Sequence, residues 1–161
     1  MKLGCCYFPE HWSEEMWADD ARRMRDMGLS LVRVGEFAWS RIEPEAGTFN
    51  WDWLDRAIET LASEGLQIIL CTPTATPPKW LVDSMPDMVA IDRHGRKRGF
   101  GSRRHYCFSH LGYREESRRI TTALAERYGQ HEAIIGWQTD NEYGCHDTVL
   151  SFSDSASAGF R

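Results

Sequence analysis

Short apolar runs recur along this chain and predict β-strands. They lie in residues 3–8, 29–37, 67–72 and 134–138. The run at residues 67–72 is continuous rather than alternating. Continuous runs are typical of strands that are covered on both faces, as in parallel sheets. The pattern therefore predicts four strands in one parallel sheet.

Apolar residues at helical spacing predict three helices between these strands. The first begins after Ser13 as its N-cap, the second occupies residues 51–64 and the third residues 113–128. Their inner faces are expected at Met16, Ala21, Met24 and Met27 in the first helix and at Leu54, Ile58 and Leu61 in the second. The glycines that end the three helices are Gly28, Gly65 and Gly129. A long proline-rich loop with a short helix around residues 80–82 precedes the third helix, and residues 152–161 begin a fourth.

The alternation of strands and helices predicts an α/β fold with right-handed crossovers. Two closures fit this pattern: a small doubly wound sheet, or the first half, about four βα units, of a (β/α)₈ TIM barrel. A complete barrel takes about 250 residues, whereas this chain has 161.

Composition narrows the class of protein. Hydrophobic residues make up 42% of the chain, which is enough for a packed core, and the net charge of −5 argues against a nucleic-acid partner. We expect no membrane partner, because no apolar run approaches about 20 residues. The N-terminus shows no signal-peptide pattern, and the odd count of 5 cysteines indicates reduced thiols. Both observations predict a cytoplasmic protein.

Polar and aromatic residues follow all four predicted strands, at residues 7–12, 35–40, 72–80 and 140–143. Ligands of parallel α/β folds bind at the carboxyl ends of the strands. We therefore expect one shared site there. The 7 tryptophans fit a concave site for flat or sugar-like ligands, or they are ordinary core residues.

Glu142 is the main catalytic candidate. A carboxyl group near Trp137 and Tyr143 can be desolvated and can then protonate a leaving oxygen, as a glycosidase acid does. Asn141 can donate a hydrogen bond to a sugar hydroxyl, and the Arg103 fork can hold hydroxyls or a carboxylate. The alternative interpretation of Glu142 is a capping or solvated carboxylate.

Glu10 and Glu36 are two further carboxylates at strand ends. Either could be the second carboxylate of a catalytic pair. The sequence favours the other interpretation, in which each forms an inward-pointing ion pair with Arg33 or Arg41.

Five segments, read together, resemble glycoside hydrolase family 42, the β-galactosidases. They are GCCYFPEHW (residues 4–12), RVGEFAWS (33–40), PTATPPKWL (73–81), GSRRHYC (101–107) and GWQTDNEYG (136–144). They occur in the order and at the spacing of the family and extend over essentially the whole chain. The match is thus more specific than any single motif.

This resemblance implies a TIM barrel that hydrolyses terminal β-galactosides with retention. It places the general acid/base on Glu142 and the galactose ligands on Arg103 and Asn141. The nucleophile of the family, a glutamate at the end of strand seven, would lie beyond residue 161. Residues 1–161 are then the truncated N-terminal part of the catalytic domain, inactive alone. The substrate would be a β-galactoside oligosaccharide, and the full-length form a homo-oligomer, often a trimer.

The resemblance also raises the question of a metal. Some family members bind a structural zinc through four cysteines, of which only Cys107 is present here. The other three positions hold Ser151, Ser153 and Ala156. A tetrahedral thiolate site is therefore not expected, although His105, His110, Cys145 and His146 lie near enough in sequence for a substitute site. We expect no cofactor, because carboxyl groups suffice for the reaction.

Two rival functions remain open from the sequence. One is another retaining glycosidase of the same clan, such as a β-mannanase or a cellulase. Such enzymes also place Asn-Glu after strand four, but the GSRRH and PPKW segments are not expected in them. The other is a non-catalytic sugar-binding module, which would use tryptophan and arginine without needing Glu142.

Overall fold

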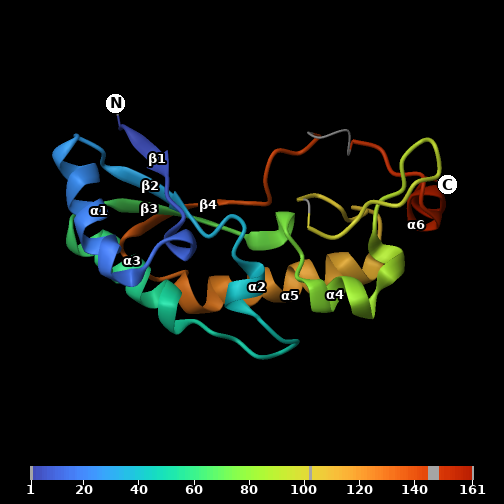
Figure 1. The fold of residues 1–161 in the computed structure, drawn as a ribbon, viewed down its shortest axis with the longest axis horizontal. Coiled ribbons are helices and arrows are strands. Elements are labelled where there is room, and N and C mark those ends of the chain that lie inside the picture. Colours follow the sequence, from blue (N-terminus) through green and yellow to red (C-terminus); the bar gives the residue numbers. More distant parts are fainter. Residues whose placement is uncertain (1, 102, 145–148, 161) are drawn as a thin grey trace.

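The computed structural model describes residues 2–101, 103–144 and 149–160. Within these residues, four parallel strands form one sheet in the order β1-β2-β3-β4 (Figure 1). The strands are β1 Gly4–Cys6, β2 Leu31–Val34, β3 Gln67–Cys71 and β4 Ile134–Gln138. Each lies inside a predicted apolar run, so the four strands and their parallel direction are confirmed.

The helices follow the predicted alternation. They are α1 Glu14–Asp26, α2 Trp39–Ile42, α3 Asp52–Ser63, α4 Lys79–Ser84, α5 Leu111–Tyr128 and α6 Asp154–Gly159, with 3₁₀ turns η1 Pro9–His11, η2 Pro73–Ala75 and η3 Pro86–Met88. α2 was not predicted, because a single turn is too short for a helical period. Gly28 and Gly65, with φ of 84° and 78°, follow α1 and α3 in the left-handed conformation that ends a helix.

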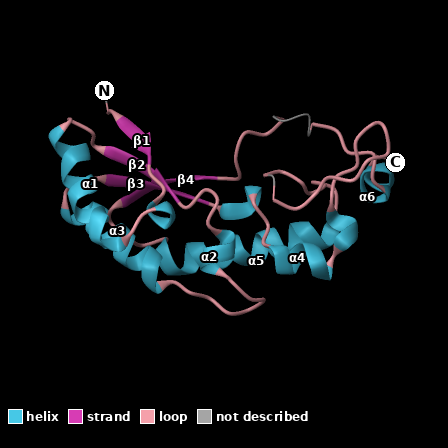
Figure 2. Ribbon diagram, viewed as in Figure 1, coloured by secondary structure: helices cyan, strands magenta, loops and turns pink. Residues whose placement is uncertain are grey.

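The helices α1, α3 and α5 lie along one face of the sheet (Figure 2). The side chains of Val32, Val34, Ile68 and Leu70 are buried in the core on that side. Alternate residues such as Arg33 and Ile69 are only half-buried, and no helix in the described part of the chain packs on their side of the sheet. The second face of the sheet therefore has no helical cover among the described residues, because the continuous apolar run does not specify which segment covers that face.

The inner face of α1 also differs from the prediction. Ala21 and Met24 are buried as expected, but Met16 and Met27 are 42% and 75% exposed. Trp17 takes the buried position instead, and its Nε1 donates a hydrogen bond to the Pro9 carbonyl at 3.1 Å. Burial of the larger indole ring therefore sets the rotation of the helix about its axis, and it turns Met16 outward. The inner face of α3, at Leu54, Ile58 and Leu61, is buried as predicted.

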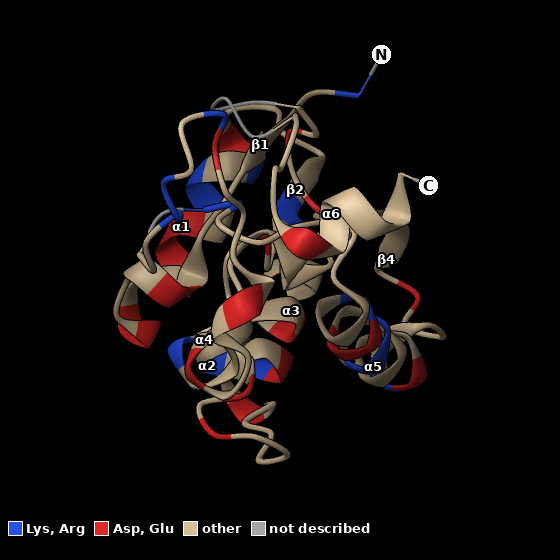
Figure 3. Ribbon diagram, turned by 90° about the vertical axis from the view of Figure 1, so that its right-hand side faces the viewer, with Lys and Arg blue, Asp and Glu red and all other residues tan. Residues whose placement is uncertain are grey.

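Charged residues of both signs are interspersed along α1 and α5 (Figure 3). Neighbouring pairs such as Arg22–Asp19 and Arg119–Glu116 form ion pairs within these helices. Among the described helices, none is long and apolar enough to cross a membrane.

Candidate active site

The turn that follows β4 carries the candidate catalytic residues. Asp140 and Glu142 both adopt left-handed backbone conformations, with φ of 54° and 47°. Non-glycine residues rarely adopt this conformation, and it persists only where surrounding contacts fix it. The contacts of residues 140–142 therefore decide where the side chains point.

Asp140 anchors this turn to the end of β3. Its carboxylate accepts hydrogen bonds from Thr74 Oγ1 at 2.8 Å, from Tyr106 Oη at 2.7 Å and from the Asn141 backbone N–H at 2.7 Å. The backbone N–H of Asp140 donates to Thr72 Oγ1 at 2.8 Å. These four hydrogen bonds lie in the interior, since Asp140 is only 6% exposed. Two strand-end loops are thus joined as the sequence predicts for a shared site.

Glu142 lies at the open side of the turn. Its side chain is 46% exposed, and its Oε2 lies 3.7 Å from Arg103 Nη1. The guanidinium of Arg103 stacks over the Phe37 ring at 5.3 Å, so it also contacts the loop after β2. The enclosure expected around the carboxyl is not formed by the described residues, because Trp137 and Tyr143 are themselves 38% and 64% exposed.

Asn141 is 5% exposed, its backbone N–H donates to the Asp140 carboxylate, and its carbonyl accepts from Arg104 Nη1 at 2.7 Å. Its Oδ1 lies 3.5 Å from Gln138 Nε2, a weak contact. Its buried Nδ2 has no hydrogen-bond partner among the described residues. Buried donors are seldom left unpaired, so this amide is available to a ligand hydroxyl. The structure thus brings Arg103, Asn141 and Glu142 together at one strand end.

The other two strand-end carboxylates behave differently from each other. Glu36 is buried and forms the predicted ion pair, with its Oε2 2.7 Å from Arg33 Nη2. The ion pair predicted for Glu10 is wrong: Arg41 donates to the backbone carbonyl of Glu10 at 2.8 Å, and no described residue hydrogen-bonds its carboxyl oxygens. The pKa of Glu10 is raised, chiefly because burial disfavours the charged form.

Residues to which the sequence assigned no individual role build much of the site, although three of them lie in the predicted strand-end segments. Asp140 and Arg104 hold the turn, and Thr72 and Thr74 supply the hydroxyl partners of Asp140. Thr72 and Thr74 follow a buried strand directly, which was a usable signal. The role of Arg104 was not visible in the sequence, because it adjoins Arg103 and one basic residue of such a pair is usually solvated.

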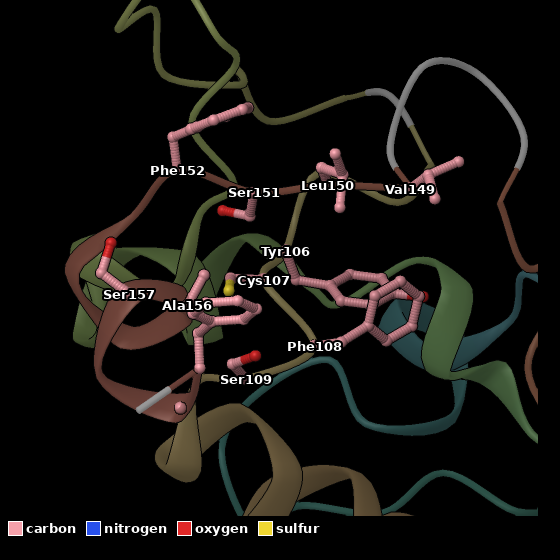
Figure 4. Close-up of a pocket in the computed structure, with 12 residues that line it drawn as sticks. Tyr106, Cys107, Phe108, Ser109, Val149, Leu150, Ser151, Phe152, Ala156 and Ser157 are labelled. Atoms are coloured by element: carbon pink, nitrogen blue, oxygen red, sulfur yellow. The ribbon is translucent and has the colours of Figure 1, made fainter.

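Cys107 lies in a separate cavity of about 580 Å³ that residues 106–109 form with residues 149–160 (Figure 4). Its Sγ accepts a hydrogen bond from Ser153 Oγ at 3.2 Å, and Ser151 Oγ lies 3.2 Å from Ser153 Oγ. The residues present here, one thiol, two hydroxyls and the Ala156 methyl, do not fit zinc, which needs cysteine or histidine ligands.

A substitute metal site is not formed by the described residues either, which contain no group of three histidine, cysteine or acidic side chains placed to hold a metal. His110 instead caps α5, because its Nδ1 accepts from the Tyr113 backbone N–H at 3.1 Å. Cys145 and His146 lie outside the described residues.

The chain is similar to known enzymes over nearly its whole length. It is 64% identical over 159 residues to a beta-galactosidase of Thermus thermophilus. The matched residues are 99% of this chain and 25% of that relative. Its structure matches the crystal structure of the beta-galactosidase from the psychrophilic Marinomonas ef1 with a TM-score of 0.97 and 61% identity, over 99% of this chain and 24% of the other. The beta-galactosidase of the Antarctic haloarchaeon Halorubrum lacusprofundi matches with a TM-score of 0.93 and 54% identity, over 96% and 23%.

These matches decide between the two closures of the sheet. The chain spans about a quarter of the length of these relatives. Its four βα units are the first half of a TIM barrel, as predicted, and not a small doubly wound sheet. The family model Glyco_hydro_42, described as Beta-galactosidase, matches residues 6–161. The chain therefore belongs to the glycoside hydrolase 42 family of beta-galactosidases.

Proposed function

We propose that this chain forms part of a retaining β-galactosidase in which Glu142 is the general acid/base. The observation that carries the proposal is the fixed turn after β4, which places Glu142 3.7 Å from Arg103 and beside the unpaired Nδ2 of Asn141. A carboxyl group, a cation and an amide donor at one strand end suit a sugar whose glycosidic oxygen must be protonated.

In the proposed reaction, Glu142 gives its proton to the glycosidic oxygen as the bond to the anomeric carbon breaks. A carboxylate from a segment that follows residue 161 attacks that carbon and forms a galactosyl ester. Glu142, now ionised, takes a proton from water, and the resulting hydroxide displaces the ester carboxylate. Two displacements retain the anomeric configuration. Arg103 and Asn141 hold the hydroxyls of the sugar throughout.

The test uses a completed chain, in which residues 1–161 replace the corresponding quarter of the Thermus thermophilus relative. Glu142→Gln should lower kcat/KM for an alkyl galactoside by several orders of magnitude, because this leaving group requires protonation. The loss should be much smaller for dinitrophenyl galactoside, whose leaving group departs unprotonated. Glu132→Gln is the matched control, because Glu132 is an exposed carboxylate just before β4, at its opposite end.

The same assay separates the rival functions. A completed chain that prefers nitrophenyl mannoside to nitrophenyl galactoside would support a mannanase-like enzyme. Galactose binding without turnover, unaffected by Glu142→Gln, would support a sugar-binding module. Equal losses of kcat/KM for both galactosides in Glu142→Gln would contradict the acid assignment. The expected trimer and cytoplasmic location stay predictions, which sedimentation of the completed chain and cell fractionation check.

We also propose that residues 149–160 are held to Cys107 by hydrogen bonds and apolar contacts, without a structural zinc. The support is the donor set itself, since Ser153 bonds Cys107 directly and Ser151 bonds Ser153. The completed chain should contain no stoichiometric zinc by elemental analysis. Substitution of Ser151, Ser153 and Ala156 together by cysteine should introduce one zinc per chain. Zinc in the unsubstituted completed chain would contradict the proposal.

A further inference from the structure

Arg104 is an unusual residue in this site. Its side chain is fully buried, and no acidic group forms an ion pair with it among the described residues. Its backbone is also left-handed, with φ of 61°. A buried cation without a carboxylate partner and a left-handed non-glycine residue each cost stability. Because both costs fall on one residue, the contacts of its side chain must offset them.

The contacts of Arg104 converge on the turn after β4. Its Nη1 donates to the backbone carbonyl of Asn141 at 2.7 Å. Its guanidinium lies 5.2 Å from the ring centre of Phe108 and 5.7 Å from that of Tyr143, within range of cation–π attraction. Its own backbone N–H donates to the Ala75 carbonyl at 2.9 Å. Arg104 thus connects the end of η2 with residues 141–143.

Arg104 and Asp140 fix Asn141 from two directions. Asp140 accepts the backbone N–H of Asn141, and Arg104 donates to its carbonyl. That carbonyl belongs to the peptide bond between Asn141 and Glu142. Its orientation therefore determines the direction in which the left-handed Glu142 projects its side chain.

We propose that Arg104 is a positioning residue, which orients the Asn141–Glu142 peptide so that the Glu142 carboxyl points its proton at a lone pair of the glycosidic oxygen. This inference rests on the proposed function of Glu142. It makes a specific demand on the kinetics: loss of Arg104 must impair substrates that need protonation more than substrates that do not. A side chain that only stabilises the fold would impair both equally.

The experiment compares Arg104→Met, Arg104→Lys and Arg96→Met in the completed chain. Met keeps the apolar stem of the arginine but removes the guanidinium donors, whereas Lys keeps one donor group and the charge. Arg96 is the control, because it is 75% exposed and pairs with Asp92 in a surface turn. For Arg104→Met we expect kcat/KM on an alkyl galactoside to fall about 10- to 100-fold, since small misplacements of reacting groups have effects of this size. On dinitrophenyl galactoside the fall should be about threefold or less, and Arg104→Lys should lie between Met and the unsubstituted chain.

A second measurement does not depend on activity. Amide hydrogen exchange in residues 139–144 should be faster in Arg104→Met, while exchange in β2 and β3 stays as in the unsubstituted chain. Equal kinetic losses on both substrates, or unchanged exchange in residues 139–144, would overturn the positioning role. An inactive unsubstituted chain would instead contradict the proposed function, and the exchange measurement would still decide whether Arg104 holds the turn.

Discussion

The centre of the sheet and its two edges are built from similar residues but have opposite surroundings. In β2 and β3, Val32 and Ile68 are fully buried beneath the helices. In β4, Ile135 and Trp137 are 45% and 38% exposed, and beside β1 Leu3 is 53% exposed. Similar apolar residues are therefore enclosed in the centre and open to solvent at the edges.

This contrast separates the position of a strand, which its apolar residues specify, from the cover of that strand, which they do not. A run of apolar residues specifies a strand that must be covered, but it does not contain the segment that covers it. The backbone groups on the outer sides of β1 and β4 have no strand partner in the described residues. Open edges and exposed apolar patches promote association between chains. The relatives are about four times as long, so we propose that their remaining segments cover these edges.

The largest expected effect concerns the 161-residue chain made alone. It should not turn over galactosides, and it should be insoluble, partly molten or self-associated through its strand edges. Light scattering and a galactosidase assay check both expectations. Ile135→Lys should reduce association by placing a charge on the β4 edge, whereas Glu132→Lys, just before the same strand, should not. A monomer with a sharp unfolding transition and measurable activity would contradict the prediction.

A smaller effect compares truncation of a central and an edge side chain. Ile58→Ala on α3 removes a side chain that is 1% exposed and should lower the free energy of unfolding of the completed chain by about 2–5 kcal/mol. Ile135→Ala in the completed chain should lower it by a comparable amount, because we expect the added segments to bury Ile135, which is 45% exposed in residues 1–161. Denaturant unfolding measures both changes. A loss near zero for Ile135→Ala would show that the β4 edge stays open in the completed chain.

The same contrast explains which parts were predictable from sequence. The strands and the core of α3 follow from periodicity, and the place of Asn141 and Glu142 follows from the rule that parallel strands end at one edge, whereas Arg103 was placed beside them only by the family resemblance. Met16 was misplaced because periodicity does not show which of two adjacent apolar residues a helix buries, and Met27 because α1 ends one residue before it, at Asp26. The partner of Glu10 and the role of Arg104 depend on contacts between distant loops. No local pattern encodes such contacts.

The smallest effect tests an ion pair that joins two helices on the covered side. Asp55 on α3 accepts hydrogen bonds from Arg127 Nε at 2.9 Å and from Tyr128 Oη at 2.7 Å, both on or at the end of α5. The hydrogen bond from Arg127 has the largest effect on the pKa of Asp55 and lowers it. Burial opposes this effect, the hydrogen bond from Tyr128 adds to it, and the pKa lies below its ordinary value. A carboxyl group with a lowered pKa in the folded state stabilises the fold above its unfolded pKa of about 3.9, and this stabilisation is lost as the pH falls through the folded value.

Because the pair is partly exposed and screened, Asp55→Asn should lower the free energy of unfolding at pH 7 by only about 1 kcal/mol. The difference between Asp55→Asn and the unsubstituted completed chain should shrink below pH 4 in denaturant titrations. Glu126→Gln, an exposed carboxylate on α5, should show a smaller difference and no such convergence. A difference for Asp55→Asn that stays constant from pH 7 to pH 3 would show that the ion pair does not contribute to stability.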